Sequence, residues 1–261
     1  MPGQALQLYT LREFTKTADA VRTTLTRVRD IGYRAVQVSA VAALEADLSP
    51  DELGKWLREL GLQCIATHRP WASLRDETER EIAFHKALGC DYVAIGGIPD
   101  GYDKLNPAEY QRFLDESLAV RNQLAAVGIR FGHHNHAFEF DRGDCGANVA
   151  PWDVLINSGA RDYFLELDVY WAWHAGVDPV GLFARMAGRV PVVHIKDKAV
   201  IGGTPVMAPI GEGNLPWGSI IQAGNAAGVE WWCVEQDECH RDAFDSVEAS
   251  YRYLREVHGL L

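Results

Sequence analysis

The feature that most constrains the fold is an alternation of short apolar runs with longer amphipathic stretches. The apolar runs are typical of buried strands and recur at intervals of roughly thirty residues. A strand followed by a helix is the repeating unit of parallel α/β proteins, so the alternation indicates a parallel sheet. The eight predicted strands are Leu6–Tyr9, Ala35–Val38, Gln63–Thr67, Tyr92–Ile95, Arg130–His134, Phe164–Val169, Val190–Ile195 and Trp231–Val234.

The stretches between the strands carry helix signals. Apolar residues fall at helical spacing in Ala18–Ile31 and in Pro107–Val127. Ser49 and Asn106 each precede a proline, which is a frequent start of a helix. A glycine ends several stretches just before the next apolar run, as expected at helix C-termini. These glycines are Gly32, Gly61, Gly89, Gly128 and Gly228.

Eight such units in 261 residues match a (β/α)8 barrel, the TIM barrel of the α/β class. The main competing architecture is a doubly wound sheet, but no Gly-x-Gly-x-x-Gly motif follows the first strand. The chain contains no linker-like or low-complexity tract. We therefore expect one domain that covers residues 1–261.

Charge and composition argue against several classes of protein. The net charge of −11 disfavours nucleic-acid binding and binding to an anionic membrane, because both need a basic face. No apolar run is long enough for a transmembrane helix, and the N-terminus lacks the pattern of a signal peptide. The five cysteines contain no C-x-x-C pair and are typical of reduced thiols. We therefore expect a cytoplasmic protein.

In a (β/α)8 barrel the active site lies at the C-terminal ends of the strands. Side-chain alternation points Asp168 into the barrel on the sixth strand and His194 into it on the seventh. Glu235 ends the eighth strand. The fifth strand ends in a dense polar segment, residues 133–136, and Glu139 follows beyond it. We expect these groups to meet at one mouth of the barrel.

Carboxylates and imidazoles that converge in this way describe a site for a divalent cation. Nitrogen among several oxygens suits Mn²⁺, our first choice, with Mg²⁺, Co²⁺ and Zn²⁺ as alternatives. Each residue also has a structural interpretation. Asp168 could be a buried acid paired with Arg12 or Lys196, His194 a core histidine, Glu235 a solvated strand-end acid and Glu139 an acid of a surface loop.

Six motifs lie in order along nearly the whole chain. They are Leu6-Gln-Leu-Tyr-Thr-Leu-Arg12, His134-Asn-His-Ala-Phe-Glu-Phe140, Leu165-Glu-Leu-Asp-Val-Tyr-Trp171, Val193-His-Ile-Lys-Asp197, Ile210-Gly-Glu-Gly-Asn-Leu-Pro-Trp217 and Val234-Glu-Gln-Asp-Glu-Cys239. Together they resemble the motifs of the xylose isomerase-like TIM-barrel superfamily, and within it those of proteins called sugar phosphate isomerase/epimerase.

The resemblance implies one divalent metal ion held by residues from strands 5 to 8. Carried over, the ligands are Glu139, Asp168, His194 and Glu235. The strand-5 position departs from the family, because many relatives have a glutamate where this chain has His134. Either Glu139 reaches back or a histidine substitutes for it, and we favour Glu139. A second departure is Gln37, where relatives often place a glutamate.

The resemblance also implies an isomerase or epimerase that transfers a proton next to the carbonyl of a ketose, inosose or keto-sugar, through a metal-stabilised enediolate. Glu139 and Glu235 are the candidate proton-transfer groups, and Lys196 would polarise the developing oxyanion. The candidate substrate-binding residues are His68, His134, His136, Gln37, Arg12, Trp71 and Trp171.

Three alternatives keep the fold but change the function. A lyase or dehydratase acting on a keto-sugar or a 3-keto-glycoside would use the same site. A DNA-repair endonuclease of the same superfamily would need a basic groove, which the net charge of −11 disfavours. A non-catalytic sugar-binding protein would bind ligand without turnover. The expected partner is a small sugar or polyol ketone, and family members often form homo-oligomers.

Overall fold

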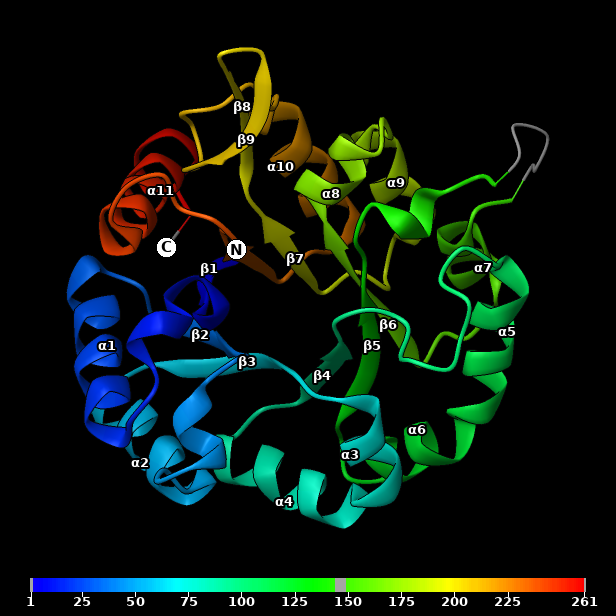
Figure 1. Ribbon diagram of the computed structural model, residues 1–261, viewed down its shortest axis with the longest axis horizontal. Helices are drawn as coiled ribbons and strands as arrows, with labels where there is room; N and C mark the ends of the chain where they lie inside the picture. Colours follow the sequence, from blue (N-terminus) through cyan, green and yellow to red (C-terminus); the bar gives the residue numbers. More distant parts are fainter. Residues whose placement is uncertain (1, 144–148, 261) are drawn as a thin grey trace.

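The computed structural model describes residues 2–143 and 149–260, and it contains a closed barrel of eight parallel strands. The predicted TIM barrel is therefore confirmed. Figure 1 shows the helices as a ring around the strands. In spatial order the strands are β1 (Gly3–Gln7), β10 (Trp231–Val234), β7 (Val192–Ile195), β6 (Tyr163–Asp168), β5 (Arg130–His134), β4 (Tyr92–Ile95), β3 (Gln63–His68) and β2 (Ala35–Val38).

Helices connect the strands on the outside of the barrel. The α-helices are α1 (Ala18–Ile31), α2 (Pro50–Leu60), α3 (Trp71–Asp76), α4 (Thr78–Leu88), α5 (Pro107–Glu116), α6 (Leu118–Ala125), α7 (Pro151–Asn157), α8 (Val169–His174), α9 (Pro179–Met186), α10 (Trp217–Ala227) and α11 (Ala243–His258). The 3₁₀ helices are η1 (Leu8–Phe14), η2 (Ala42–Glu45) and η3 (Phe138–Phe140).

The helix boundaries follow the signals in the sequence. The Ser49 hydroxyl accepts a hydrogen bond from the Glu52 N–H at 3.2 Å, which caps α2 as expected for serine at this position. At its other end, Gly61 adopts the left-handed conformation with φ +66°, which costs a glycine nothing sterically. The predicted stop glycines Gly32, Gly89 and Gly228 likewise have positive φ at the ends of α1, α4 and α10.

One predicted helix is interrupted in the structure rather than continuous. The stretch Pro107–Val127 breaks at Ser117 into α5 and α6. The Ser117 hydroxyl and the Arg121 guanidinium both donate to the Leu114 carbonyl oxygen, at 3.2 and 3.1 Å. These side chains satisfy a carbonyl that a continuous helix would use itself, so the backbone can turn there.

Two further elements differ from the prediction. The first strand ends at Gln7 rather than Tyr9, because the chain turns into η1 and the Gln7 side chain accepts a bond from the Tyr9 N–H. After β7 the chain forms an antiparallel hairpin of β8 (Asp197–Ile201) and β9 (Thr204–Ala208), which the eight predicted strands do not include. The hairpin projects from the ring of helices at the top of Figure 1.

The barrel interior changes from apolar to polar along its axis. A small cluster that includes Ala5, Ala35, Val192 and Cys233 fills one level of the interior. Buried polar side chains, among them Glu166, lie toward the C-terminal ends of the strands. The apolar level therefore closes the barrel below a polar level that faces the mouth.

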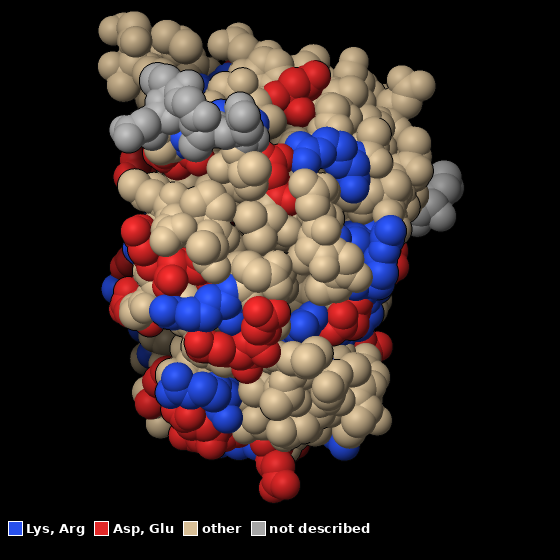
Figure 2. Space-filling model, turned by 90° about the vertical axis from the view of Figure 1, so that its right-hand side faces the viewer, with Lys and Arg blue, Asp and Glu red and all other residues tan. Residues whose placement is uncertain are grey.

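The helices, the surface charges and the cysteines can be compared with what the composition predicts. In the described part of the chain, no helix has both the length and the apolar composition needed to cross a bilayer. On the face shown in Figure 2, acidic and basic side chains are interspersed. Four cysteines are free thiols, of which Cys64, Cys90 and Cys233 are buried. Cys145 lies outside the described residues.

Candidate functional site

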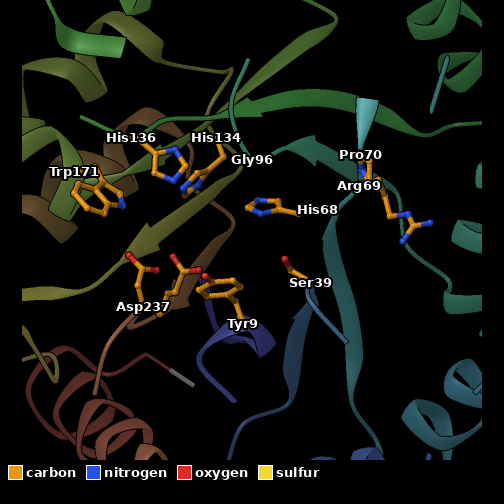
Figure 3. Close-up of a pocket in the computed structure, with 11 residues that line it drawn as sticks. Tyr9, Ser39, His68, Arg69, Pro70, Gly96, His134, His136, Trp171 and Asp237 are labelled. Atoms are coloured by element: carbon orange, nitrogen blue, oxygen red, sulfur yellow. The ribbon is translucent and has the colours of Figure 1, made fainter. Parts of the chain in front are cut away.

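A cavity of about 540 Å³ opens at the C-terminal ends of the barrel strands. Figure 3 shows Trp171 and Asp237 on one side of it, His68 nearer the middle, and Arg69 toward the other side. Tyr9 reaches it from η1. Polar side chains at the ends of strands far apart in the sequence thus meet at one mouth of the barrel, as the barrel geometry requires.

Four buried side chains, of which His134 and Glu235 line the cavity, bring one potential ligand atom each within 4.8 Å of one another. They are His134 at the end of β5, Asp168 at the end of β6, His194 in β7 and Glu235 just after β10. His194 Nδ1 lies 2.9 Å from Glu235 Oε2, and His134 Nε2 lies 3.8 Å from Asp168 Oδ2. We call these four residues the ligand cluster.

The ligand cluster fits a divalent cation. Two imidazole nitrogens and two carboxylate oxygens are a donor set that Mn²⁺, Co²⁺ and Zn²⁺ all accept. Asp168 Oδ2 is buried, and although the Lys196 ammonium lies 3.0 Å away, the oxygen accepts no well-aligned hydrogen bond from any described residue. Such an oxygen is costly to bury without a positive charge beside it, and a divalent ion could take the place that Lys196 fills here.

Burial and neighbouring charges shift the pKa values of three members of the ligand cluster. Burial raises the pKa of Asp168 to about 6, although Lys196 opposes that rise. Burial also disfavours the charge of Glu235, but Lys196 and His194 hold its pKa well below the usual range. Burial disfavours the imidazolium of His194, yet Glu166 and Glu235 raise its pKa to about 9. Binding of a cation therefore has to release a proton from His194.

Glu166 lies behind the ligand cluster and contacts several of its members. Its carboxylate is fully buried, with Oε2 3.2 Å from His134 Nδ1 and 3.4 Å from His194 Nε2. The same oxygen contacts His68 Nε2. Gln37 joins the set, since its amide donates to Glu166 Oε1 at 2.9 Å and its carbonyl oxygen lies 2.7 Å from His194 Nε2. A carboxylate behind metal-binding histidines fixes which ring nitrogen faces the ion.

These contacts also define a second group of potential ligands. His68, His134, Glu166 and His194 offer atoms within 4.8 Å of one another. We favour the ligand cluster over this group for a physical reason. Glu166 Oε2 already lies among three imidazole nitrogens. Burial disfavours the charge of Glu166, but His194 and His68 keep its pKa well below its usual range. The position that a cation would need is taken by the oxygen itself.

Lys196 lies among the acids of the site. Its Nζ is 2.6 Å from Glu235 Oε2, 3.0 Å from Asp168 Oδ2 and 3.1 Å from both oxygens of Asp237. Although burial opposes its charge, these acids raise the pKa of Lys196 above its usual range. The ammonium is therefore a permanent positive charge next to the ligand cluster.

The structure does not bring Glu139 into the ligand cluster, contrary to the expectation from the sequence. The η3 turn directs its carboxylate backward, where Oε1 lies 3.0 Å from His133 Nε2 and Oε2 accepts from the His136 N–H at 2.7 Å. Burial raises the pKa of Glu139. The Glu139 side chain therefore holds the segment after β5 in its conformation. His134, and not Glu139, is the member of the ligand cluster that comes from β5.

The predicted substrate-binding residues divide into two sets. His68, His134, His136 and Trp171 line the cavity. Trp71 lines an adjoining cavity, and Gln37 is fully buried behind the ligand cluster. Arg12 contacts the site indirectly, because its guanidinium donates to the backbone oxygens of Tyr9 and Asp237, both at 2.9 Å.

Two functional candidates were not singled out from the sequence as site residues. Glu166 shares the inward face of β6 with Asp168, so side-chain alternation was a usable signal for it. Asp237 follows the last strand, and alternation does not extend beyond a strand end. Only the acidic run that begins at Glu235 pointed to it.

Comparisons with known proteins support the fold. A sequence model of a family described as "Xylose isomerase-like TIM barrel" matches residues 25–257. Among proteins with curated descriptions, no sequence matches.

Solved structures resemble the whole chain. A sugar phosphate isomerase/epimerase from Parabacteroides distasonis is 22% identical with a TM-score of 0.79, covering 97% of this chain and 98% of that one. The IOLI protein with a binding zinc atom is 15% identical with a TM-score of 0.73, covering 98% and 97%. The probable 3-DHS dehydratase AsbF from Bacillus anthracis is 14% identical with a TM-score of 0.72, covering 97% and 98%.

Proposed function

The chain belongs to the xylose isomerase-like TIM barrel family, and we propose that it is a divalent-metal-dependent isomerase or epimerase of keto-sugars or polyol ketones. The observation that carries this proposal is the ligand cluster of His134, Asp168, His194 and Glu235, two members of which line the cavity. Mn²⁺ remains our first choice for the ion. The similarity to a structure that holds a zinc atom supports a metal ion in a barrel of this fold.

A cation held by the ligand cluster would stabilise negative charge on a substrate oxygen while a proton leaves the neighbouring carbon. The chain supplies the proton-transfer groups. Glu235 lines the cavity and is ionised at neutral pH, because Lys196 and His194 lower its pKa against the effect of burial. It is therefore our candidate for the general base.

His68 is our candidate for the second proton carrier. Its ring lines the cavity, while its Nε2 contacts the Glu166 carboxylate. A buried carboxylate behind an imidazole orients the ring and can exchange a proton with it through their hydrogen bond. His68 thus takes the role that the sequence had suggested for Glu139. Lys196 lies next to Glu235 and contributes a fixed positive charge for the developing oxyanion.

Unpaired polar atoms at the cavity wall suit a ligand with several hydroxyl groups. Trp171 Nε1 and His136 Nδ1 are buried and have no hydrogen-bond partner among the described residues. Burial lowers the pKa of His136 to about 4, so its ring is neutral at physiological pH. A neutral imidazole and an indole N–H can each bond a hydroxyl without introducing charge. The Trp171 face offers an apolar surface to a sugar ring.

A lyase acting on a keto-sugar derivative is the second candidate. A neighbouring cavity of about 680 Å³ shares Arg69, Gly96 and His136 with the first. It therefore gives room for a leaving group next to the carbon that loses its proton. The similarity to a probable dehydratase structure agrees with this second outcome.

The experiment incubates the metal-loaded protein in D₂O with ketohexoses, ketopentoses, inososes and 3-keto-glucosides, and follows each by proton NMR. Isomerase or epimerase activity exchanges the hydrogen next to the carbonyl and changes the configuration or the carbonyl position. Lyase activity releases the leaving group and creates an unsaturated product. Glu235→Gln should abolish either reaction, whereas Glu230→Gln, at the opposite end of β10, should not. Turnover that survives Glu235→Gln would refute the assigned base.

A further inference from the structure

We infer that Lys196 is a resident cation of the ligand cluster, which an arriving metal ion displaces from Asp168 and Glu235 toward Asp237. The inference rests on the proposed function, because it concerns the same ligands. Lys196 Nζ lies 3.0 Å from Asp168 Oδ2 and 2.6 Å from Glu235 Oε2. These are oxygens that the ligand cluster offers to a metal ion.

An ammonium and a divalent cation cannot keep the same two oxygens. Both are positive, and their repulsion is strong at such a short separation in a buried site. The Lys196 side chain is 1% exposed, so water screens the repulsion little. Without a counter-ion the buried carboxylates would repel each other. Lysine therefore stabilises the metal-free centre and, for the same reason, competes with the ion.

The site provides a destination for the displaced ammonium. Asp237 lines the cavity, its side chain is 26% exposed, and both of its oxygens already lie 3.1 Å from Lys196 Nζ. The Trp171 ring centroid is 5.8 Å from the same nitrogen, and an aromatic face attracts a cation. A flexible lysine stem can keep the Asp237 contact while it releases the other two.

This arrangement couples two events. When the ion takes the oxygens of Asp168 and Glu235, the ammonium is directed toward the wall of the cavity, where it would meet a substrate oxygen. Asp237 is then a positioning residue, which acts through Lys196 rather than on the ion.

The first test measures the affinity of metal-stripped protein for Mn²⁺ and Zn²⁺ by calorimetry. Lys196→Met should bind metal about tenfold or more tightly than wild type, since it removes the competing charge. Lys198→Met, a matched lysine on β8, should bind like wild type. Equal or weaker binding by Lys196→Met while wild type binds metal would overturn the inference and leave the proposed function standing. If neither wild type nor any variant binds metal, both the inference and the proposed function are overturned. If only Lys196→Met binds metal, the inference is supported, because Lys196 then excludes the ion completely.

A double-mutant cycle tests the destination. Asp237→Asn should weaken metal binding when Lys196 is present, because the displaced ammonium loses the carboxylate that receives it. The same substitution should have a smaller effect in Lys196→Met. An equal loss in both backgrounds would mean that Asp237 acts on the ion directly, against the inference.

A third measurement needs no variant and so does not depend on how a variant folds. Reductive methylation of wild type, read by mass spectrometry, should modify Lys196 faster in the presence of saturating metal, because displacement carries the amine from a buried position to the cavity. A rate that metal leaves unchanged or lowers would contradict displacement.

Discussion

At the scale of single residues, Glu166 organises the site without lining the cavity. One carboxylate oxygen contacts the rings of His68, His134 and His194, and Gln37 donates to the other oxygen. His68, His194 and their neighbours keep the pKa of this buried acid low, so it stays charged. It therefore holds the ring nitrogens of two proposed ligands and one proposed proton carrier in fixed orientations.

Glu166→Gln tests this role. The amide keeps the size of the side chain but loses the charge that orients the rings, so we expect the affinity for metal to fall about tenfold to hundredfold. Calorimetric titration measures the change, and circular dichroism verifies the fold. Glu230→Gln, an exposed glutamate at the other end of β10, is the matched control. Unchanged affinity in a folded Glu166→Gln protein would show that the histidines are oriented by other contacts.

Side-chain alternation was sufficient to predict that Asp168 and His194 point inward, because strand geometry is regular. Alternation does not extend to Glu139, which lies beyond the end of β5 and is turned by η3 toward His133. The conformation of a short turn depends on contacts made by the whole fold, and no pattern in the sequence encodes them. The same limit applies to Asp237.

A buried histidine away from the site predicts a pH dependence of stability. His85 Nε2 lies 2.7 Å from the Thr67 hydroxyl and Nδ1 lies 2.7 Å from the Glu81 carbonyl oxygen. Burial lowers the pKa of His85, and Arg69 acts in the same direction while Glu81 opposes it. Because the folded pKa is below the unfolded one, this stabilising contribution is present above the unfolded pKa of about 6.5 and is lost as the pH falls.

Urea unfolding at about pH 7 and about pH 5 measures this effect. Wild type should lose more free energy of unfolding between the two conditions than His85→Gln, which cannot take up the proton. His240→Gln, at an exposed position, should follow wild type. Identical losses in wild type and His85→Gln would remove His85 as a source of the pH dependence.

At the scale of elements, the hairpin β8–β9 is tied to the barrel by Asp197. Its buried carboxylate accepts hydrogen bonds from the backbone N–H groups of Lys198, Gly211, Gly213 and Leu215 and from the Trp217 indole, at 2.7 to 3.2 Å. A Cβ atom on Gly213 would lie 2.3 Å from Asp197 Oδ1, so glycine permits this close approach. The motif 210–217 therefore builds a cradle for one carboxylate, next to Lys196.

Asp197→Asn should weaken this cradle. An amide NH₂ group in place of one oxygen turns a donor toward N–H donors, so we expect a loss of about 2 to 4 kcal/mol in the free energy of unfolding. Hydrogen exchange should quicken at the amides of Gly211, Gly213 and Leu215. Asp178→Asn, at the cap of α9, should leave those amides protected. Protection that persists in Asp197→Asn would assign the anchoring to other contacts.

The sequence predicted the barrel elements better than this hairpin. Strands such as β2 and β4 begin and end where their apolar runs do, because burial determines both. In residues 197–208 two apolar runs of three residues each flank Gly202 and Gly203, and runs this short do not distinguish a hairpin from a loop. The polar Asp197, which anchors the segment, gives no strand signal in the sequence.

At the scale of the whole molecule, the residues that stabilise the barrel lie apart from the polar residues of the ligand cluster. Apolar residues of the strands pack under the helices, and a small apolar cluster fills one level of the interior. The polar side chains of the ligand cluster are gathered at the mouth from four different strand ends. Since the helices and the lower interior do not depend on those polar groups, single substitutions in the ligand cluster should preserve the fold.

The central claim is that the mouth of this barrel holds a divalent ion. The most direct test is the metal content of purified protein, for wild type beside Asp168→Ala and His194→Ala, with the fold verified by circular dichroism. We predict about one divalent ion per chain in wild type and its loss in both variants. A well-folded wild type that stays metal-free after incubation with excess Mn²⁺ or Zn²⁺ would contradict the account.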